Sequence, residues 1–119
     1  DRQKNSLVDC IKNYFGDSEV EDWQCQECQE KREATRTVEL IRAPPVLIIQ
    51  LVRYIHVPDG SAVKNSAKVE YQMELEISIG DGENRIENHV YHLRGIACHL
   101  GRDLRSGHYI AFCKNSMDN

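Results

Sequence analysis

The sequence lacks an excess of positive charge, since its 15 Lys and Arg residues face 19 Asp and Glu residues and the formal net charge is −4. Nucleic-acid binding needs Lys and Arg concentrated on one face, so this composition argues against DNA or RNA as the main partner. The sequence also lacks an apolar run as long as a membrane span or a signal-peptide core. We therefore expect neither a membrane partner nor an export signal.

An even set of cysteines is also missing. The five that are present are not spaced like a disulfide framework, and two of them form Cys25-x-x-Cys28. Such a pair suits metal ligation in a reducing compartment better than disulfide bonding. This pattern predicts an intracellular protein, cytoplasmic or nuclear.

What is present is a globular composition, with 40% hydrophobic and 29% charged residues among 119. That length suits one domain or part of one, and no internal repeat or low-complexity tract divides it. We expect residues 1–119 to form a single unit. Because the chain opens on Asp1 without a Met, we also expect it to belong to something longer.

The first element that the pattern predicts is an amphipathic helix over residues 6–15. Ser6 and Asp9 resemble a capping box, apolar residues follow at steps of three and four, and Gly16 suits the end of a helix. The acidic run that follows, residues 17–22, reads as a solvated loop.

Cys25 and Cys28 have the spacing of a zinc knuckle, because two thiolates three positions apart on a tight turn can reach one tetrahedral ion. Such an ion needs four ligands, and the pattern supplies two. Cys98 and His99 are poor candidates to complete the site, since neighbours on a strand point to opposite faces. Either the partner knuckle lies elsewhere or the pair is metal-free, so zinc is expected only as a structural half-site.

Strands are predicted for most of the remaining chain. Residues 35–41 are rich in β-formers, and the near-continuous apolar run 46–52, after two prolines, predicts a fully buried central strand. Residues 55–67 read as a connecting loop. A strand starts at 68–71, and the alternation in 73–79 predicts a half-buried strand that a turn at 80–82 closes.

The C-terminal part predicts an antiparallel hairpin. Residues 90–100 alternate as one strand, a polar loop covers 101–107, and a second strand starts at His108. The predicted fold class is therefore α+β, with a mostly antiparallel sheet and one N-terminal helix.

His108 is the candidate catalytic residue. A histidine at the first position of a strand, beside the flexible Gly107, is well placed to act as a general base near neutral pH. The alternative is that His108 packs against the hairpin or caps it.

These pieces, in this order, resemble the ubiquitin-specific protease family of cysteine deubiquitinases. The specific segments are the run Pro44-Pro45-Val46-Leu47-Ile48-Ile49-Gln50-Leu51 and the triplet Gly107-His108-Tyr109. Less specific matches are the Ser6–Cys10 segment, the Cys25-x-x-Cys28 pair, Arg53-Tyr54, Tyr91-x-Leu93 and His99.

The resemblance implies roles for these residues within a papain-like cysteine protease fold, of which the chain is the palm and part of the fingers. His108 is the general base, and Cys25 and Cys28 are one knuckle of the fingers zinc site. The loop from Gly101 to Ser106 is the blocking loop beside the channel for the ubiquitin tail. The implied substrate-binding residues are Gly101, Arg102, Asp103, Leu104, Arg105, Ser106, Gly107 and Tyr109.

The implied function is hydrolysis of the (iso)peptide bond at the ubiquitin C-terminus, with ubiquitin or a ubiquitinated protein as partner. The family's nucleophile lies in an upstream Asn-Thr-Cys box and its orienting Asp or Asn follows a Trp; neither is visible here, and Asp118 and Asn119 are not assigned. The isolated chain, the C-terminal portion of such a domain, is expected to be inactive. The alternative is an inactive relative that binds ubiquitin or another protein.

Overall fold

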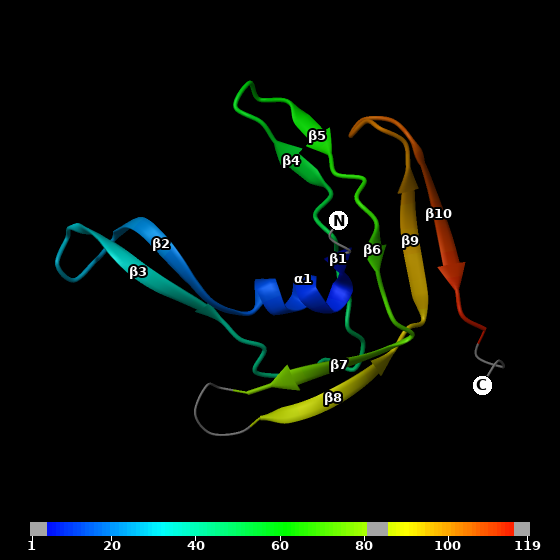
Figure 1. The fold of residues 1–119 in the computed structure, drawn as a ribbon, viewed down its shortest axis with the longest axis horizontal. Coiled ribbons are helices and arrows are strands. Elements are labelled where there is room, and N and C mark those ends of the chain that lie inside the picture. Colours follow the sequence, from blue (N-terminus) through cyan, green and yellow to red (C-terminus); the bar gives the residue numbers. More distant parts are fainter. Residues whose placement is uncertain (1–4, 81–85, 116–119) are drawn as a thin grey trace.

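The computed structural model describes residues 5–80 and 86–115, and within these ranges strands surround a single helix (Figure 1). In chain order the elements are β1 (Asn5–Ser6), α1 (Leu7–Tyr14), β2 (Gly16–Gln24), β3 (Lys31–Val38), β4 (Tyr54–His56), β5 (Ala62–Lys64), β6 (Val69–Glu70), β7 (Glu74–Ile79), β8 (Glu87–His92), β9 (Gly95–Leu100) and β10 (His108–Cys113).

These strands form five two-stranded sheets in the described ranges. Four are antiparallel, namely β2–β3, β4–β5, β7–β8 and β9–β10, and the short β1–β6 pair is parallel. The predicted α+β class is confirmed, although the strands do not join into one continuous sheet. Nowhere in residues 5–80 and 86–115 is a helix long and apolar enough to cross a membrane.

Helix α1 forms where its capping residues predict it. The Ser6 hydroxyl accepts a hydrogen bond from the Asp9 backbone N–H at 3.1 Å, which satisfies one of the free donors at the helix start. At the other end, Phe15 N–H donates to Ile11 O at 3.0 Å and Gly16 turns the chain with a φ of +98°. The predicted helix is thus confirmed to within one residue at each end.

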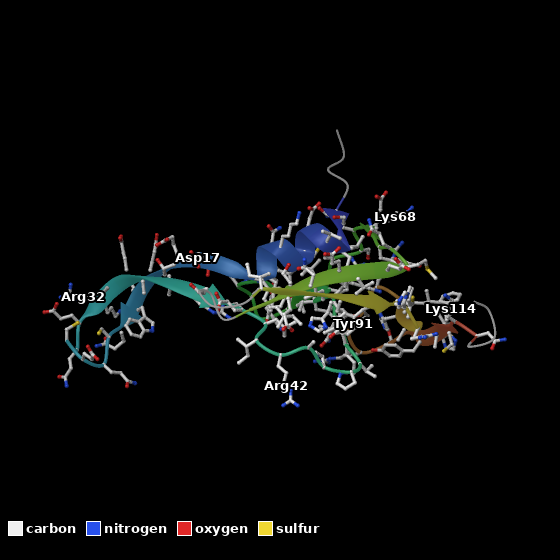
Figure 2. The ribbon with its side chains drawn as sticks, turned by 90° about the horizontal axis from the view of Figure 1, so that it is seen from below. Asp17, Arg32, Arg42, Lys68, Tyr91 and Lys114 are labelled. Atoms are coloured by element: carbon white, nitrogen blue, oxygen red, sulfur yellow. The ribbon has the colours of Figure 1, made fainter. Side chains whose placement is uncertain are left out.

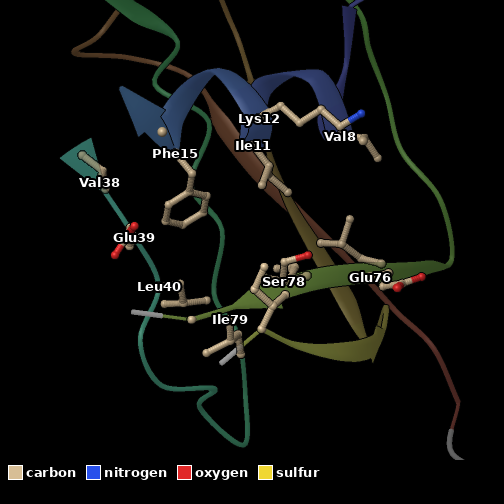
Figure 3. A pocket seen from close by; sticks show the side chains of 15 residues that line it. Val8, Ile11, Lys12, Phe15, Val38, Glu39, Leu40, Glu76, Ser78 and Ile79 are labelled. Atoms are coloured by element: carbon tan, nitrogen blue, oxygen red, sulfur yellow. The ribbon is translucent and has the colours of Figure 1, made fainter. Parts of the chain in front are cut away.

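The small core lies between α1 and β7. Ile77 and Ile79, each 5% exposed, are the buried hydrophobic residues of the described chain. They line a cavity of about 450 Å³ that faces the apolar side of α1, where Ile11 and Phe15 point toward it (Figure 3). This confirms the half-buried strand that the alternation in 73–79 predicts; residues 81 and 82 of the predicted turn lie outside the described residues.

Outside this core the structure is open. Its accessible surface is 11020 Å², whereas a compact monomer of this mass exposes about 6,600 Å². The radius of gyration is 18.4 Å, against about 13.5 Å for a compact chain of this length. The reason is visible in Figure 1, where the hairpins β2–β3, β4–β5 and β9–β10 extend away from α1 in different directions. Apart from Ile77 and Ile79, the apolar side chains of the described residues are therefore exposed or only half-buried.

The prediction of a buried central strand at residues 46–52 is wrong. The run forms no strand in the described chain, and Val46, Ile48 and Val52 are 75%, 87% and 82% exposed. Its entry is held by the Tyr91 hydroxyl, which donates to Pro44 O at 2.8 Å. A central strand needs a hydrogen-bonded neighbour on each edge. An apolar run indicates only that its side chains must be buried against some other part of the protein. The strand prediction failed for that reason.

Two predicted loops are hairpins instead. The acidic residues 17–22 belong to β2, because the Thr37 hydroxyl donates to Asp17 at 2.6 Å and Thr35 donates to Glu19 at 3.4 Å across the β2–β3 pair. Residues 55–67 contain most of the β4–β5 hairpin, which reverses at Gly60 with a φ of +86°. In both segments, pairing with a neighbouring strand stabilises a β-strand although the composition is polar.

Three predicted strands have different bounds in the structure. Strand β3 begins and ends earlier than the predicted 35–41, and β6 is shorter than 68–71. Residues 90–100 contain parts of two strands, since β8 pairs with β7 and β9 pairs with β10. Between them, Leu93 N–H donates to Met73 O at 2.8 Å. Side-chain alternation continues through the change of partner and cannot reveal it.

Candidate active site at the mouth of the β9–β10 hairpin

The predicted hairpin around His108 is confirmed. In the β9–β10 register, His108 lies opposite Leu100 and Tyr109 lies opposite His99. Residues opposite each other in an antiparallel pair share a face, so His99 and Tyr109 lie on one face and His108 on the other. The loop 101–107 joins the two strands and brings all the predicted substrate-binding residues to this mouth.

His108 itself is exposed, and in residues 5–80 and 86–115 no hydrogen bond to its imidazole is found. An exposed ring does not support the alternative in which His108 packs into the hairpin. Its nitrogens can accept a proton from a group that approaches from outside, as a general base requires.

His99 is the most connected side chain at this mouth. Its Nδ1 lies 3.1 Å from the Tyr54 hydroxyl and 3.0 Å from Lys64 Nζ, both on the β4–β5 hairpin. Its Nε2 lies 3.2 Å from Ser106 O in the loop, and its ring centroid is 4.9 Å from that of Tyr109. A single imidazole therefore connects three separate segments.

Gly107 and Gly101 fit closely around this ring. Gly107 has a φ of +142°, and a Cβ built there collides with His99 Nε2 and lies 2.6 Å from Leu100 O. Gly101 has a φ of +141°, and its Cβ position lies 3.3 Å from Ser106 O. Gly107 thus tolerates no side chain, both because of its backbone conformation and because His99 occupies the space.

Sequence reasoning missed Lys64, and it named Tyr54 and His99 only as matches to the family, without a site role. Tyr54 and Lys64 stand 45 and 35 positions from His99 in the chain. Lys64 also falls in the stretch that reads as a connecting loop. No local pattern could have identified it; only a correct prediction of the β4–β5 hairpin and of its packing would have done so.

The second predicted site, Cys25 and Cys28, lies on a turn at the tip of the β2–β3 arm. Cys25 N–H donates to Glu30 O at 3.0 Å, and Arg32 Nε donates to Cys28 Sγ at 3.1 Å. A hydrogen bond with the Glu30 backbone, followed by those with Arg32 and Cys25, lowers the pKa of the Cys28 thiol. Thiolates are what a zinc ion binds, so the turn has the donor chemistry of a ligand pair.

This turn fits half of a tetrahedral site. The described part of the chain holds no cluster of three or more His, Cys, Asp or Glu residues that could bind a metal. Strand β9, which carries Cys98 and His99, lies on the other side of α1 from the tip of the β2–β3 arm (Figure 1). Figure 2 likewise shows Arg32 at the tip of the arm and Lys114, which follows β10, at the opposite end of the molecule.

Comparison with known sequences places the chain among ubiquitin hydrolases. The sequence model described as ubiquitin carboxyl-terminal hydrolase matches residues 1–119. Ubiquitin carboxyl-terminal hydrolase 8 of Saccharomyces cerevisiae is 30% identical over 126 residues, covering 97% of this chain and 26% of that protein. Ubiquitin carboxyl-terminal hydrolase 48 of Rattus norvegicus is 31% identical over 113 residues, covering 92% of this chain and 11% of that protein.

Solved structures agree with this. The Ubp8/Sgf11/Sus1/Sgf73 DUB module of SAGA bound to ubiquitin aldehyde matches with a TM-score of 0.78 and 30% identity, over 98% of this chain and 28% of that one. A SAGA DUB module with a Ubp8 variant bound to monoubiquitin matches with a TM-score of 0.74 and 28% identity. The chain spans roughly a quarter or less of these relatives. It belongs to the ubiquitin carboxyl-terminal hydrolase family, in the ubiquitin-specific protease branch that its motifs predict.

Proposed function

We propose that the protein containing this chain is a cysteine-type deubiquitinase, which hydrolyses the (iso)peptide bond at the C-terminus of ubiquitin, and that this chain supplies its catalytic histidine. The observation that carries the proposal is the exposed His108 at the end of a loop that Lys64 and His99 hold. Support comes from the family and from relatives whose solved structures hold ubiquitin or ubiquitin aldehyde.

In the proposed reaction His108 acts first as a base and then as an acid. Its imidazole takes the proton from a cysteine thiol outside this chain, and the thiolate attacks the terminal carbonyl of ubiquitin. The resulting imidazolium gives its proton to the amine that leaves, and water then releases ubiquitin from the acyl-enzyme. The exposed position of His108 leaves room for both the nucleophile and the substrate.

Residues 101–107 and Tyr109 are proposed to border the channel for the ubiquitin tail. All of them are exposed and border the same hairpin mouth as His108. The hydrogen bond from Arg105 N–H to Asp103 at 3.3 Å gives the middle of the loop a local turn, while its two ends are held by Lys64 and His99. A loop fixed at both ends can border a channel without closing it.

Residues 1–119 are proposed to be the C-terminal portion of a catalytic domain. The exposed apolar run 46–52 then packs against the remainder of that domain, which supplies the cover that the described chain does not. In the same domain Cys25 and Cys28 supply two of four ligands to a zinc ion. The ion, when bound, is a structural cross-link at the tip of the β2–β3 arm, away from His108.

The test is turnover of a ubiquitin C-terminal amide by the full-length protein and by its His108→Ala variant, with ubiquitin affinity measured in parallel. We expect the rate to fall about a hundred- to ten-thousand-fold, the usual worth of general-base catalysis. Affinity should change little, because it comes from a broad surface. His56→Ala is the matched control, since His56 is an exposed histidine on β4.

A His108→Ala variant that kept more than about a tenth of the rate would contradict this role, because a general base is worth at least about a hundredfold. A wild-type protein that binds ubiquitin and does not cleave the amide would instead support the alternative, an inactive binding relative.

A further inference from the structure

We propose that Lys64 and His99 are positioning residues for His108: Lys64 fixes the His99 ring and the start of the loop, and the ring fixes the residues on both sides of His108. The inference rests on the proposed function of His108 and adds to it two residues on separate elements. Neither residue touches the reacting atoms in this scheme; both act through the placement of His108.

The first step is the Lys64 ammonium, which is half-buried at the end of β5. It has three N–H donors and no acceptor, and three acceptors surround it. These are His99 Nδ1 at 3.0 Å, His99 O at 3.1 Å and Gly101 O at 2.6 Å. The cation thus holds both the ring and the backbone at the point where β9 passes into the loop.

The second step is the orientation of the imidazole. Because Lys64 can only donate, His99 Nδ1 must accept, and in the neutral ring the proton then sits on Nε2. That nitrogen is 3.2 Å from Ser106 O, so it donates to the far end of the loop. The contact with Lys64 therefore determines the proton position that lets His99 hold Ser106.

The third step is the position of His108 relative to this ring. Ser106 accepts from the ring, Gly107 lies directly against Nε2, and the Tyr109 ring lies 4.9 Å away. The residues before and after His108 are thereby both set by His99. His108 lies on the other face of the hairpin and is exposed there.

The base of the β4–β5 hairpin makes Lys64 a firm point of attachment. Asn65 N–H donates to Arg53 O at 2.5 Å, and the Arg53 guanidinium donates back to Asn65 O at 3.4 Å and Ala67 O at 2.5 Å. Tyr54, the neighbour of Arg53, adds its hydroxyl to His99 at 3.1 Å. Through Lys64 and His99, the loop 101–107 is thus attached to the β4–β5 hairpin as well as to its own strands. Figure 1 shows that hairpin beside the loop.

The kinetic test uses Lys64→Met in the full-length protein, since methionine keeps the length of the side chain and removes all three donors. We expect kcat on the ubiquitin amide to fall about ten- to a hundredfold, because a misplacement of about 1 Å can cost roughly a hundredfold. Affinity for ubiquitin should stay within about twofold, as the broad binding surface is unchanged. Lys68→Met is the matched control, an exposed lysine four positions away.

A second readout does not depend on activity. The loop carries Arg102 and Arg105, both exposed, so trypsin added to the native protein reports how firmly the loop is held. We expect faster cleavage after these residues in Lys64→Met than in wild type or Lys68→Met, because proteases act on transiently opened segments. Peptide mass spectrometry measures both cleavage rates.

The outcomes separate this inference from the proposed function. An inactive wild-type protein whose loop is nevertheless cleaved faster in Lys64→Met would contradict the proposed function and support the attachment of the loop. An unchanged cleavage rate, an unchanged kcat in an active protein, or an equal loss of kcat and of ubiquitin affinity would each overturn the positioning role.

Discussion

The thiol turn and the hairpin mouth are built in opposite ways. At the tip of the β2–β3 arm, Cys25 contacts Glu30 and Cys28 contacts Arg32, all within eight consecutive residues. At the mouth of β9–β10, His99 takes its partners from positions 45 and 35 residues earlier. The thiol turn needs only its own residues to form. The arrangement around His99 forms only when the β4–β5 and β9–β10 hairpins pack together.

Gly107→Ala should have the largest effect, because it changes the residue directly before His108. The new Cβ meets Leu100 O at 2.6 Å and collides with His99, so the loop and His108 must shift. We expect kcat/KM to fall about a hundredfold or more, as for a misplacement of about 1 Å. Gly60→Ala is the matched control, since Gly60 also has a positive φ but nothing within 4 Å of its Cβ position. Equal losses in the two variants would show that backbone strain alone matters.

Cys28→Ser tests the other side of the comparison. We expect zinc affinity to fall at least about tenfold, because substitution of residues that only hydrogen-bond to metal ligands already lowers metal affinity by about that factor. Turnover should change far less. Metal analysis after dialysis against a chelator, beside an amide hydrolysis assay, measures both. Cys113→Ser, which changes an exposed thiol outside the turn, should keep the metal. Full zinc retention in Cys28→Ser would remove Cys28 from the ligand set.

Tyr54→Phe is a finer change at the mouth. It removes one of the two donors that share the lone pair of His99 Nδ1 and leaves Lys64 Nζ, 3.0 Å from the same atom. A hydrogen bond is worth about 1 kcal/mol, so turnover should fall by at most about fivefold, less than in Lys64→Met. A larger loss than in Lys64→Met would mean that the Tyr54 hydroxyl, and not the ammonium, orients the ring.

Ser61→Ala should have the smallest effect, at the turn of the hairpin that carries Lys64. The Ser61 hydroxyl and backbone N–H donate to Asp59 at 2.6 and 2.8 Å and hold the pKa of that carboxyl below its ordinary value. Their contribution to stability is present at neutral pH and is lost as pH falls through the lowered pKa. Without the hydroxyl the pKa should rise, which a carbon-13 titration of the Asp59 carboxyl detects. An unchanged titration would show that the backbone N–H suffices.

The same contrast explains what the sequence could predict. Helix α1 depends on Ser6, Asp9 and Gly16, which lie beside it in the chain, and the β9–β10 hairpin depends on alternation around a polar loop. These elements are confirmed. The position of Cys25 and Cys28 on a turn could be inferred for the same reason, because the contacts of that turn are local.

The wrong predictions concern segments whose structure depends on contacts with residues far away in the sequence. Residues 46–52 have the composition of a buried strand, yet no strand of the described chain pairs with them. Residues 55–67 have the composition of a loop, yet they pair as β4–β5 and bring Lys64 to His99. Composition indicates whether a segment favours burial or exposure to solvent. Its contacts with segments distant in the chain decide whether it forms a strand.

The most direct test of the account is a double-mutant cycle between Lys64→Met and His108→Ala, measured as the rate of ubiquitin amide hydrolysis by the full-length protein. If Lys64 acts by positioning His108, Lys64→Met should slow the protein about ten- to a hundredfold when His108 is present and have little further effect once it is gone. An equal fold-loss in both backgrounds would contradict the account, because Lys64 would then act independently of the histidine.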